Sequence, residues 1–472
     1  MFRPTVSLIL VLTLPCLVRA HADAAGPPDP NNGNIPLCTA AGAQFVSAIA
    51  SDGAGGAIVA WLDVRDSAHN EIYVQRTSAA GVPQWTAKGL ALTVGQQCVT
   101  PRLVSDGAKG AIVVWSDRRS GNLDIYAQRV SASGVPLWTP NGVPLCTAAE
   151  VQDFSEIVSD GSGGAIVTWL DSRHGNGYDI YAQRVSAAGV PQWTADGVPI
   201  CTALAAHDQT MTSDGAGGAI IAWQDARNGY PNNVGIYAQR VNGAGVQQWA
   251  SNGVTLCVAD ERRERPRIAS DGAGGAIVAW ADFRRYPNND TYAQRVNAAG
   301  VPQWTANGVA LCTAPTGHSG DPMIVTDGAG GAIVAWTDFR RDPNDDIYVQ
   351  RVNAAGVPQW AASGVALCTA DGYQSEPTIV SDGSGGAIVA WYDCRSSISS
   401  DIYAQRVNAA GVLRWTIDGT PVSTARGEQL GPIIASDGAG GAIVTWQDTR
   451  SGPLRHVYAQ RIDRFGKPSS RK

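Results

Sequence analysis

Charge is scarce in this sequence. Only 16% of its 472 residues are charged, the net charge is −6 and the isoelectric point is about 5.5. A nucleic-acid groove needs a concentration of Lys and Arg, so this balance argues against one. Beyond the N-terminal region, no apolar run approaches the ~20 residues that a membrane span requires. No window has the 3.6-residue apolar period of an amphipathic helix, which argues against a helix-rich fold.

Motifs for common chemistry are also missing. There is no His-Glu-x-x-His metalloprotease motif and no Gly-x-Ser-x-Gly nucleophile elbow in a supporting context. The glycine-rich phrase at Asp327 lies between two predicted strands, whereas a phosphate loop leads into a helix. Two acidic stretches could offer oxygen ligands to calcium, but their spacing is not that of a recognised loop: Asn288, Asn289, Asp290 and Asp342, Asn344, Asp345. We therefore predict no cofactor and no metal site.

The N-terminus has the form of an export signal. Arg3 precedes an apolar run from Val6 to Val18, and Ala20-His21-Ala22 resembles a cleavage site. We predict a signal peptide at 1–22, a linker at 23–33, a repeat domain at 34–464 and a polar tail at 465–472. The expected protein is secreted or periplasmic, monomeric, and has no membrane span.

One phrase recurs eight times along the chain. Its form is Ser-Asp-Gly-Ala-Gly-Gly-Ala-Ile-Val-Ala-Trp, and successive copies are 54 to 57 residues apart. A fixed period of this size indicates an array of identical supersecondary units. We assign a structural role to the Asp that opens each turn: Asp52, Asp106, Asp160, Asp214, Asp271, Asp327, Asp382 and Asp437.

Each repeat predicts four short antiparallel strands. In the sixth copy these lie around 322–326, 331–336, 346–352 and 358–369, joined by glycine-rich turns and polar connections. Eight such units describe an all-β, eight-bladed β-propeller. The last copy lacks its fourth strand, and the segment from Asn34 to Ala40 supplies an equivalent phrase. We therefore predict that this segment pairs with the strand near 457–462 and closes the ring; a β-solenoid is the alternative.

All 15 tryptophans fall in two repeat positions, which favours packing between blades over sugar stacking. Seven begin the fourth strand. The eight that end the second strand are assigned a structural role: Trp61, Trp115, Trp169, Trp223, Trp280, Trp336, Trp391 and Trp446. Each of these eight opens a Trp-x-Asp-x-Arg phrase, which could form a ring of ion pairs.

Six cysteines share one repeat position, and equivalent points on neighbouring units are too far apart for a disulfide. They are Cys38, Cys146, Cys201, Cys257, Cys312 and Cys368. We expect small buried residues here and no disulfide in the mature chain.

These phrases, with Asp-Ile-Tyr-Ala-Gln-Arg-Val, resemble the repeats of secreted bacterial β-propeller proteins, many of which have no assigned activity. There is a fainter similarity to the Asp-box of sialidase-type propellers. Here Ser adjoins Asp and Trp comes late, which departs from the Asp-box pattern. The resemblance implies the propeller fold and adds little on activity.

Variation between copies is concentrated in two connections, from strand two to three and from strand four to the next blade. In an up-and-down blade both emerge on one face, which is the usual layout of a binding surface. We therefore predict ligand-binding residues there: His174, Tyr178, Tyr230, Tyr286, His318 and Tyr373. Solvated loops under no constraint would show the same variation.

The expected function is a non-enzymatic scaffold that binds a glycan, peptide or protein. The alternatives are an extracellular glycoside hydrolase or lyase and a purely structural envelope component. An enzyme would need a singular pair of carboxylates, or a His with acid/base partners, at one end of the ring.

Overall fold

A computed structural model describes residues 33–469, apart from 176, 204–205, 230–232, 259–260, 287, 314–319, 342 and 397–398. The predicted signal peptide lies outside these residues. The described residues form strands and turns, and they contain no helix that could span a lipid bilayer.

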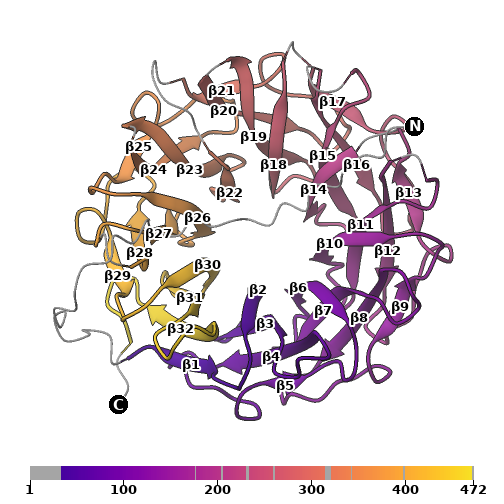
Figure 1. The fold of residues 1–472 in the computed structure, drawn as a ribbon. Helices are drawn as coiled ribbons and strands as arrows, with labels where there is room; N and C mark the ends of the chain where they lie inside the picture. Colours follow the sequence, from indigo (N-terminus) through magenta and orange to yellow (C-terminus); the bar gives the residue numbers. More distant parts are fainter. Residues whose placement is uncertain are drawn as a thin grey trace.

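The strands form eight antiparallel sheets of four strands, which confirms the all-β, eight-bladed propeller (Figure 1). We number the blades 1 to 8 in the chain order of their first strands. These first, inner strands surround the centre of the ring: β2 (Gln44–Ser51), β6 (Cys98–Ser105), β10 (Gln152–Ser159), β14 (Ala206–Ser213), β18 (Arg263–Ser270), β22 (Met323–Thr326), β26 (Gln374–Ser381) and β30 (Gln429–Ser436).

The other strands follow outward in each blade. The second strands are β3 (Ala57–Asp63), β7 (Ala111–Asp117), β11 (Ala165–Asp171), β15 (Ala219–Asp225), β19 (Ala276–Arg285), β23 (Ala332–Arg341), β27 (Ala387–Asp393) and β31 (Ala442–Asp448). The third strands are β4 (Glu71–Thr77), β8 (Asp124–Val130), β12 (Asp179–Val185), β16 (Gly235–Val241), β20 (Asn288–Val296), β24 (Asn344–Val352), β28 (Asp401–Val407) and β32 (His456–Ile462). The outer strands are β5 (Leu90–Ala91), β9 (Val143–Cys146), β13 (Val198–Cys201), β17 (Val254–Cys257), β21 (Val309–Cys312), β25 (Val365–Cys368), β29 (Thr420–Ser423) and, for blade 8, β1 (Ile35–Cys38).

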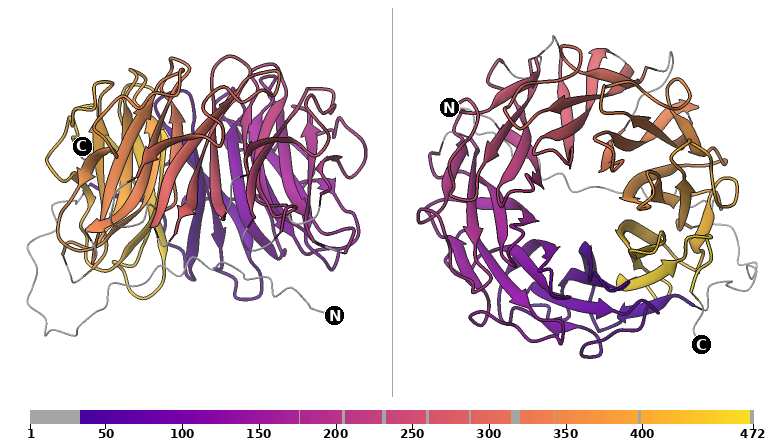
Figure 2. Two further views of the ribbon diagram at one scale, coloured as in Figure 1. Left: turned by 90° about the horizontal axis from the view of Figure 1, so that it is seen from above. Right: turned by 180° about the vertical axis from the view of Figure 1, so that it is seen from behind.

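The N-terminal strand closes the ring as the sequence predicts. Ile35 pairs with Ala459 and Cys38 pairs with Val457, so β1 is the outer strand of blade 8. Figure 2 shows indigo β1 beside yellow β32. Because β1 pairs with β32, the third strand of blade 8 is not left as an exposed edge.

The register separates the two faces of the ring. In blade 3, Gln152 at the start of β10 pairs with Asp171 at the end of β11, which pairs with Asp179 at the start of β12. The connections from strand two to three and from blade to blade therefore share one face, which we call the connection face. The Asp-Gly turns share the opposite turn face. In blade 6, Asp327 Oδ1 accepts hydrogen bonds at 2.8 Å from the amides of Ala329 and Gly331.

Each second-strand Trp packs against the preceding blade. Trp336 is fully buried in a cluster with Ile277, Leu311 and Cys312 of blade 5, and all eight equivalents are 0% exposed. The continuous apolar phrase Ala-Ile-Val-Ala is buried on both faces, because each blade is covered by a neighbouring blade on either side.

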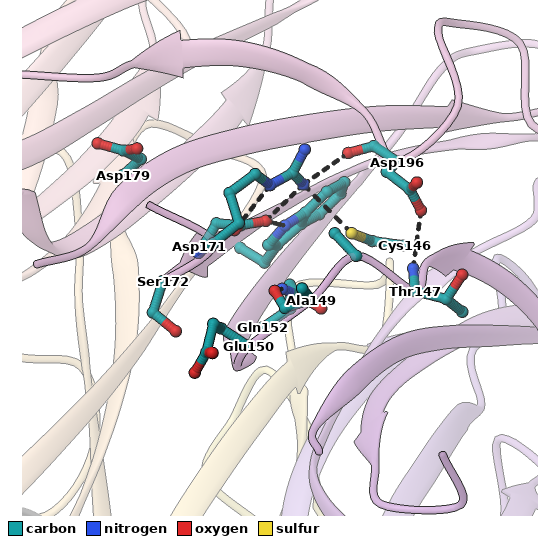
Figure 3. Close-up of polar contacts among 12 residues, drawn as sticks. Cys146, Thr147, Ala149, Glu150, Gln152, Asp171, Ser172, Asp179 and Asp196 are labelled. Atoms are coloured by element: carbon teal, nitrogen blue, oxygen red, sulfur yellow. Dashed lines mark hydrogen bonds and ion pairs between the residues drawn. The ribbon is translucent and has the colours of Figure 1, made fainter. Parts of the chain in front are cut away.

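The Trp-x-Asp-x-Arg phrase forms a local hub rather than a ring of linked ion pairs. In blade 3, Trp169 Nε1 donates to Asp171 Oδ2 at 2.8 Å, and Arg173 binds both Asp171 oxygens at 2.6 and 2.8 Å. Arg173 also donates to Cys146 Sγ of blade 2 at 3.3 Å, and Figure 3 shows Cys146 near Asp171. The guanidinium of Arg173 stacks on the ring of Tyr181. All eight blades have this Asp–Arg pair. The pair satisfies a buried carboxylate and ties neighbouring blades together.

The cysteines of the shared position are buried, as expected, and burial raises the pKa of the Cys38 thiol to about 11. Seven cysteines are free thiols: Cys38, Cys98, Cys146, Cys201, Cys257, Cys312 and Cys368. Cys394 is disulfide-bonded, so the expectation of no disulfide is wrong for this residue and holds for the seven free thiols.

Candidate functional site

The inner strands carry a bulge close to the connection face. The register of β10 with β11 shifts between Asp153 and Glu156, and the same shift recurs in five other blades. A bulge turns one side chain away from the regular alternation, and bulges are common beside functional sites. The third residue of the strand has a left-handed backbone, with φ between 46° and 58° in Thr100, Phe154, Asp208, Arg265, Glu376 and Gly431.

We call the second and third residues of the inner strands the inner rim. Its sixteen members are Phe45, Val46, Val99, Thr100, Asp153, Phe154, His207, Asp208, Glu264, Arg265, Gly320, Asp321, Ser375, Glu376, Leu430 and Gly431. Gly320 and Asp321 precede β22, and they are placed by the register that makes Met323 equivalent to Thr378.

The inner rim is asymmetric, unlike the rest of the ring. Blades 3 to 7 contribute five carboxyl groups, one guanidinium and one imidazole, whereas blades 8, 1 and 2 contribute mainly apolar residues. Residues that recur in every blade build the array. The rim is therefore the place where side chains that occur once are brought together.

The part of the rim in blades 5 to 7 is charged. Arg265 forms an ion pair with Asp321 of the next blade, and Arg262 Nε lies 2.9 Å from Glu264 Oε1. Burial raises the pKa of Glu264, and the carboxylates of Asp208 and Asp321 add to that rise against the two arginines. Burial also raises the pKa of Glu376, with a contribution from Asp321. Carboxyl groups with a raised pKa thus lie beside the ion-paired Asp321, and such a difference in environment is what acid/base chemistry uses.

The part of the rim in blades 3 and 4 is aromatic and polar. Tyr178 packs edge-on against His207, with 6.2 Å between the ring centres. Burial lowers the pKa of His207, although Asp208 opposes this. Phe154 exposes 43% of its surface, and its carbonyl accepts a hydrogen bond at 2.9 Å from Gln209 Nε2. An exposed aromatic ring beside polar groups can stack on a ligand and also orient it.

The structure places the predicted ligand-binding residues at separate points of the connection face. Tyr178 lies beside the rim, and His174 Nδ1 lies 2.6 Å from Asp179 Oδ2 in the same blade. Tyr286 is 75% exposed at the tip of the β19–β20 hairpin, and Tyr373 is 49% exposed just before β26. Tyr230 and His318 lie outside the described residues. Of the four that are described, only Tyr178 makes a ring contact with a rim residue.

The sequence analysis missed the charged rim residues because it assigned them to variable connections. One signal could have identified them. In five blades the third residue of the inner strand directly precedes a proline: Thr100, Arg265, Asp321, Glu376 and Gly431. The recurring proline restricts the backbone of the residue before it, while the side chain of that residue differs from blade to blade. This combination is typical of a position used for recognition.

Buried carboxyl groups also lie at or near the start of several third strands. Burial raises the pKa of Asp290 and Asp346 to about 6, although Arg285 and Arg341 oppose it. Burial raises the pKa of Asp401 to about 7, and Asp393 adds to the rise. Among the described residues, no three His, Cys, Asp or Glu side chains are placed to hold a metal ion.

Replacing Asp401 by Asn should stabilise the protein at pH 8 and have little effect at pH 4. The folded pKa of about 7 lies above the ordinary value of 3.8, so folding favours the proton. The contribution of protonated Asp401 to the free energy of unfolding is complete below the unfolded pKa and is lost as the pH rises through 7. Asn cannot ionise, so the variant avoids this loss. The gain in unfolding free energy at pH 8 is at most about 4 kcal/mol, measured by urea denaturation.

Asp179→Asn is the matched control, because Asp179 occupies the same position and already contacts His174. No stabilisation is expected there. If wild type and Asp401→Asn have the same pH dependence of stability between pH 4 and 8, Asp401 does not carry a proton in the folded state.

Comparison with known proteins assigns no family to this chain. No family model matches the chain, and a search of curated proteins found no match. Similar solved structures include an ulvan lyase of a new polysaccharide lyase family (12% identity, 80% of this chain and 96% of that chain, TM-score 0.45). Others are an oligogalacturonate lyase from Vibrio parahaemolyticus (11%, 91% and 100%, TM-score 0.44) and an α-L-arabinanase from Penicillium chrysogenum (12%, 66% and 93%, TM-score 0.38). Similarity this distant carries no information on activity, and the Asp-box likeness is not shown.

Proposed function

We propose that this protein is an exported β-propeller that binds a hydroxyl-rich ligand, a glycan, at the inner rim. One observation carries the proposal: the non-repeated polar and aromatic side chains of an otherwise repetitive ring meet at one end of its inner strands. The scaffold positions hold the ring together in every blade. The rim side chains have no role that is shared between blades, so they can contact a ligand without disturbing the packing of the ring.

The composition of the rim favours a neutral glycan. Carboxylates outnumber guanidinium groups there by five to one, so an anionic chain such as a polyuronate would be repelled. Exposed Phe154 offers a stacking surface, and the carboxylates offer acceptors for sugar hydroxyls. Export rests on the N-terminal segment predicted as a signal peptide.

A second candidate function is hydrolysis of a glycosidic bond. Glu376 and Asp321 occupy equivalent rim positions in blades 7 and 6, and Asp321 is ion-paired with Arg265. Burial raises the pKa of Glu376, which suits a general acid, while an ion-paired Asp321 suits a general base. A lyase fits less well, because its uronate substrate is anionic.

A glycan screen with rim variants tests the binding proposal. Phe154→Ser should lower the affinity for a bound neutral oligosaccharide by about tenfold, the usual worth of one aromatic contact. Phe465→Ser is the matched control, since Phe465 is also exposed but lies in the last turn on the turn face. Titration calorimetry on the chain from residue 23 measures both. Equal losses in the two variants, or no loss in either, would place binding elsewhere.

The same samples separate binding from hydrolysis. Release of reducing ends from the bound oligosaccharide, abolished by Glu376→Gln with little change in affinity, would establish the second candidate. Binding without release in wild type would leave a scaffold that binds glycans.

A further inference from the structure

One position of the inner strands is proline in five blades and polar in the other three, which have Ser47, Ser155 and Gln209 there. The fourth residue of the strand, or its equivalent before β22, is a buried proline in blades 2, 5, 6, 7 and 8. In blades 3 and 4 the same position holds Ser155 and Gln209, which are only 2% and 7% exposed. The fourth position can therefore hold the small apolar side chain of proline, but blades 3 and 4 bury a polar side chain there.

The polar groups in this position are incompletely hydrogen-bonded. Gln209 Nε2 donates to the carbonyl of Phe154 at 2.9 Å, but Gln209 Oε1 has no partner among the described residues. Ser155 Oγ has none there either. Burying an unsatisfied acceptor costs free energy that proline would avoid. The two oxygens are therefore expected to accept hydrogen bonds from something outside the described chain.

The surroundings define what could donate those hydrogen bonds. Phe154 precedes Ser155, and its carbonyl accepts a hydrogen bond from Gln209. Tyr178 packs against His207, which lies two residues before Gln209 in β14. Asp153 Oδ1 is already occupied, because it accepts hydrogen bonds from Ser116 Oγ at 2.8 Å and from Thr100 Oγ1 at 3.3 Å. The unoccupied groups are thus neutral acceptors next to an exposed aromatic ring.

We propose that Ser155 and Gln209 form a subsite that accepts hydrogen bonds from the hydroxyls of an uncharged sugar unit stacked on Phe154. This inference rests on the proposed glycan binding and names the substrate class at one end of the rim. A uronate would meet the carboxylates of Asp153 and Asp208 and is excluded by like charge. An ammonium group would be drawn to those carboxylates rather than to an amide oxygen.

Gln209→Met tests the subsite because it keeps the length of the side chain and removes the acceptor. The probes are neutral tetrasaccharides of gluco, xylo, arabino and galacto configuration, with an oligogalacturonate as the anionic comparison. We expect the affinity for the best neutral probe to fall about tenfold and the melting temperature to stay the same or rise. Gln209→Pro copies five other blades and provides a second variant if Met is not tolerated.

Gln429→Met is the matched control. Gln429 is fully buried and, like Gln209, has an Oε1 without a partner among the described residues, but it is the first residue of β30, in blade 8 on the apolar side of the rim. Its replacement should leave the affinity unchanged. Wild-type affinity in both Gln209 variants, or tighter binding of the oligogalacturonate than of every neutral probe, would overturn the subsite. If the subsite is overturned but Phe154→Ser still loses binding, glycan binding at the rim remains supported. The experiment therefore distinguishes failure of the subsite from failure of the proposed function.

Discussion

Replacing Trp336 by Ala is expected to lower the free energy of unfolding by about 3–5 kcal/mol, the range for truncating a large buried aromatic residue. Trp336 is fully buried between blades 5 and 6, and its Nε1 donates to Asp338 Oδ2 at 2.9 Å. The neighbouring Gly364 has φ of 94°, and a Cβ there would lie 2.7 Å from the indole. The backbone is thus built closely around this ring, so the cavity cannot easily collapse. Urea denaturation followed by tryptophan fluorescence and circular dichroism measures the loss.

Val357→Ala serves as the control for this substitution. Val357 lies in the same blade and is 53% exposed on the turn face, so its truncation should change stability by less than about 0.5 kcal/mol. A Trp336→Ala protein that melts like wild type but loses glycan binding would reverse the structural assignment of this tryptophan position.

The sequence was sufficient to predict the architecture because the evidence for it is repeated eight times. The Asp-Gly turn at Asp327 and the apolar phrase after it each point to the same local structure in every copy. The missing last strand and the extra first one, around Leu37, predict closure directly. The hub around Asp171 was predicted only in outline. Sequence spacing shows that Asp and Arg can meet, but not that the guanidinium reaches Cys146 of the preceding blade.

The inner rim could not be predicted in the same way. Strand alternation assigns side chains to two faces, but a bulge at Phe154, Arg265 and Glu376 resets that alternation. The approach of Asp321 to Arg265 depends on contact between neighbouring inner strands, which no spacing within one repeat encodes. Exposed aromatic residues of the loops, such as Tyr286, were therefore easier to identify than the charged residues of the rim.

Removing residues 33–40 is expected to cause the largest loss of stability of any change considered. These residues contain β1, whose Ile35, Leu37 and Cys38 are buried against Val59 and Trp61 of blade 1. Burial of three such side chains contributes about 5 kcal/mol or more. The truncated chain would also expose the edge of β32, which is a template for pairing with another molecule. We expect aggregation or a lowered, broadened melting transition, measured by light scattering and calorimetry.

A point substitution separates ring closure from the general effect of shortening the chain. Leu37→Asp places an unpaired carboxylate between blades 8 and 1, because Leu37 is only 2% exposed. Leu137→Asp makes the same chemical change at a residue that is 48% exposed in blade 2. Leu37→Asp should reproduce the behaviour of the truncated chain, and Leu137→Asp should melt like wild type. If the truncated chain stays monomeric and melts at the wild-type temperature, closure by β1 does not hold the ring together, and the contacts between the other blades must suffice.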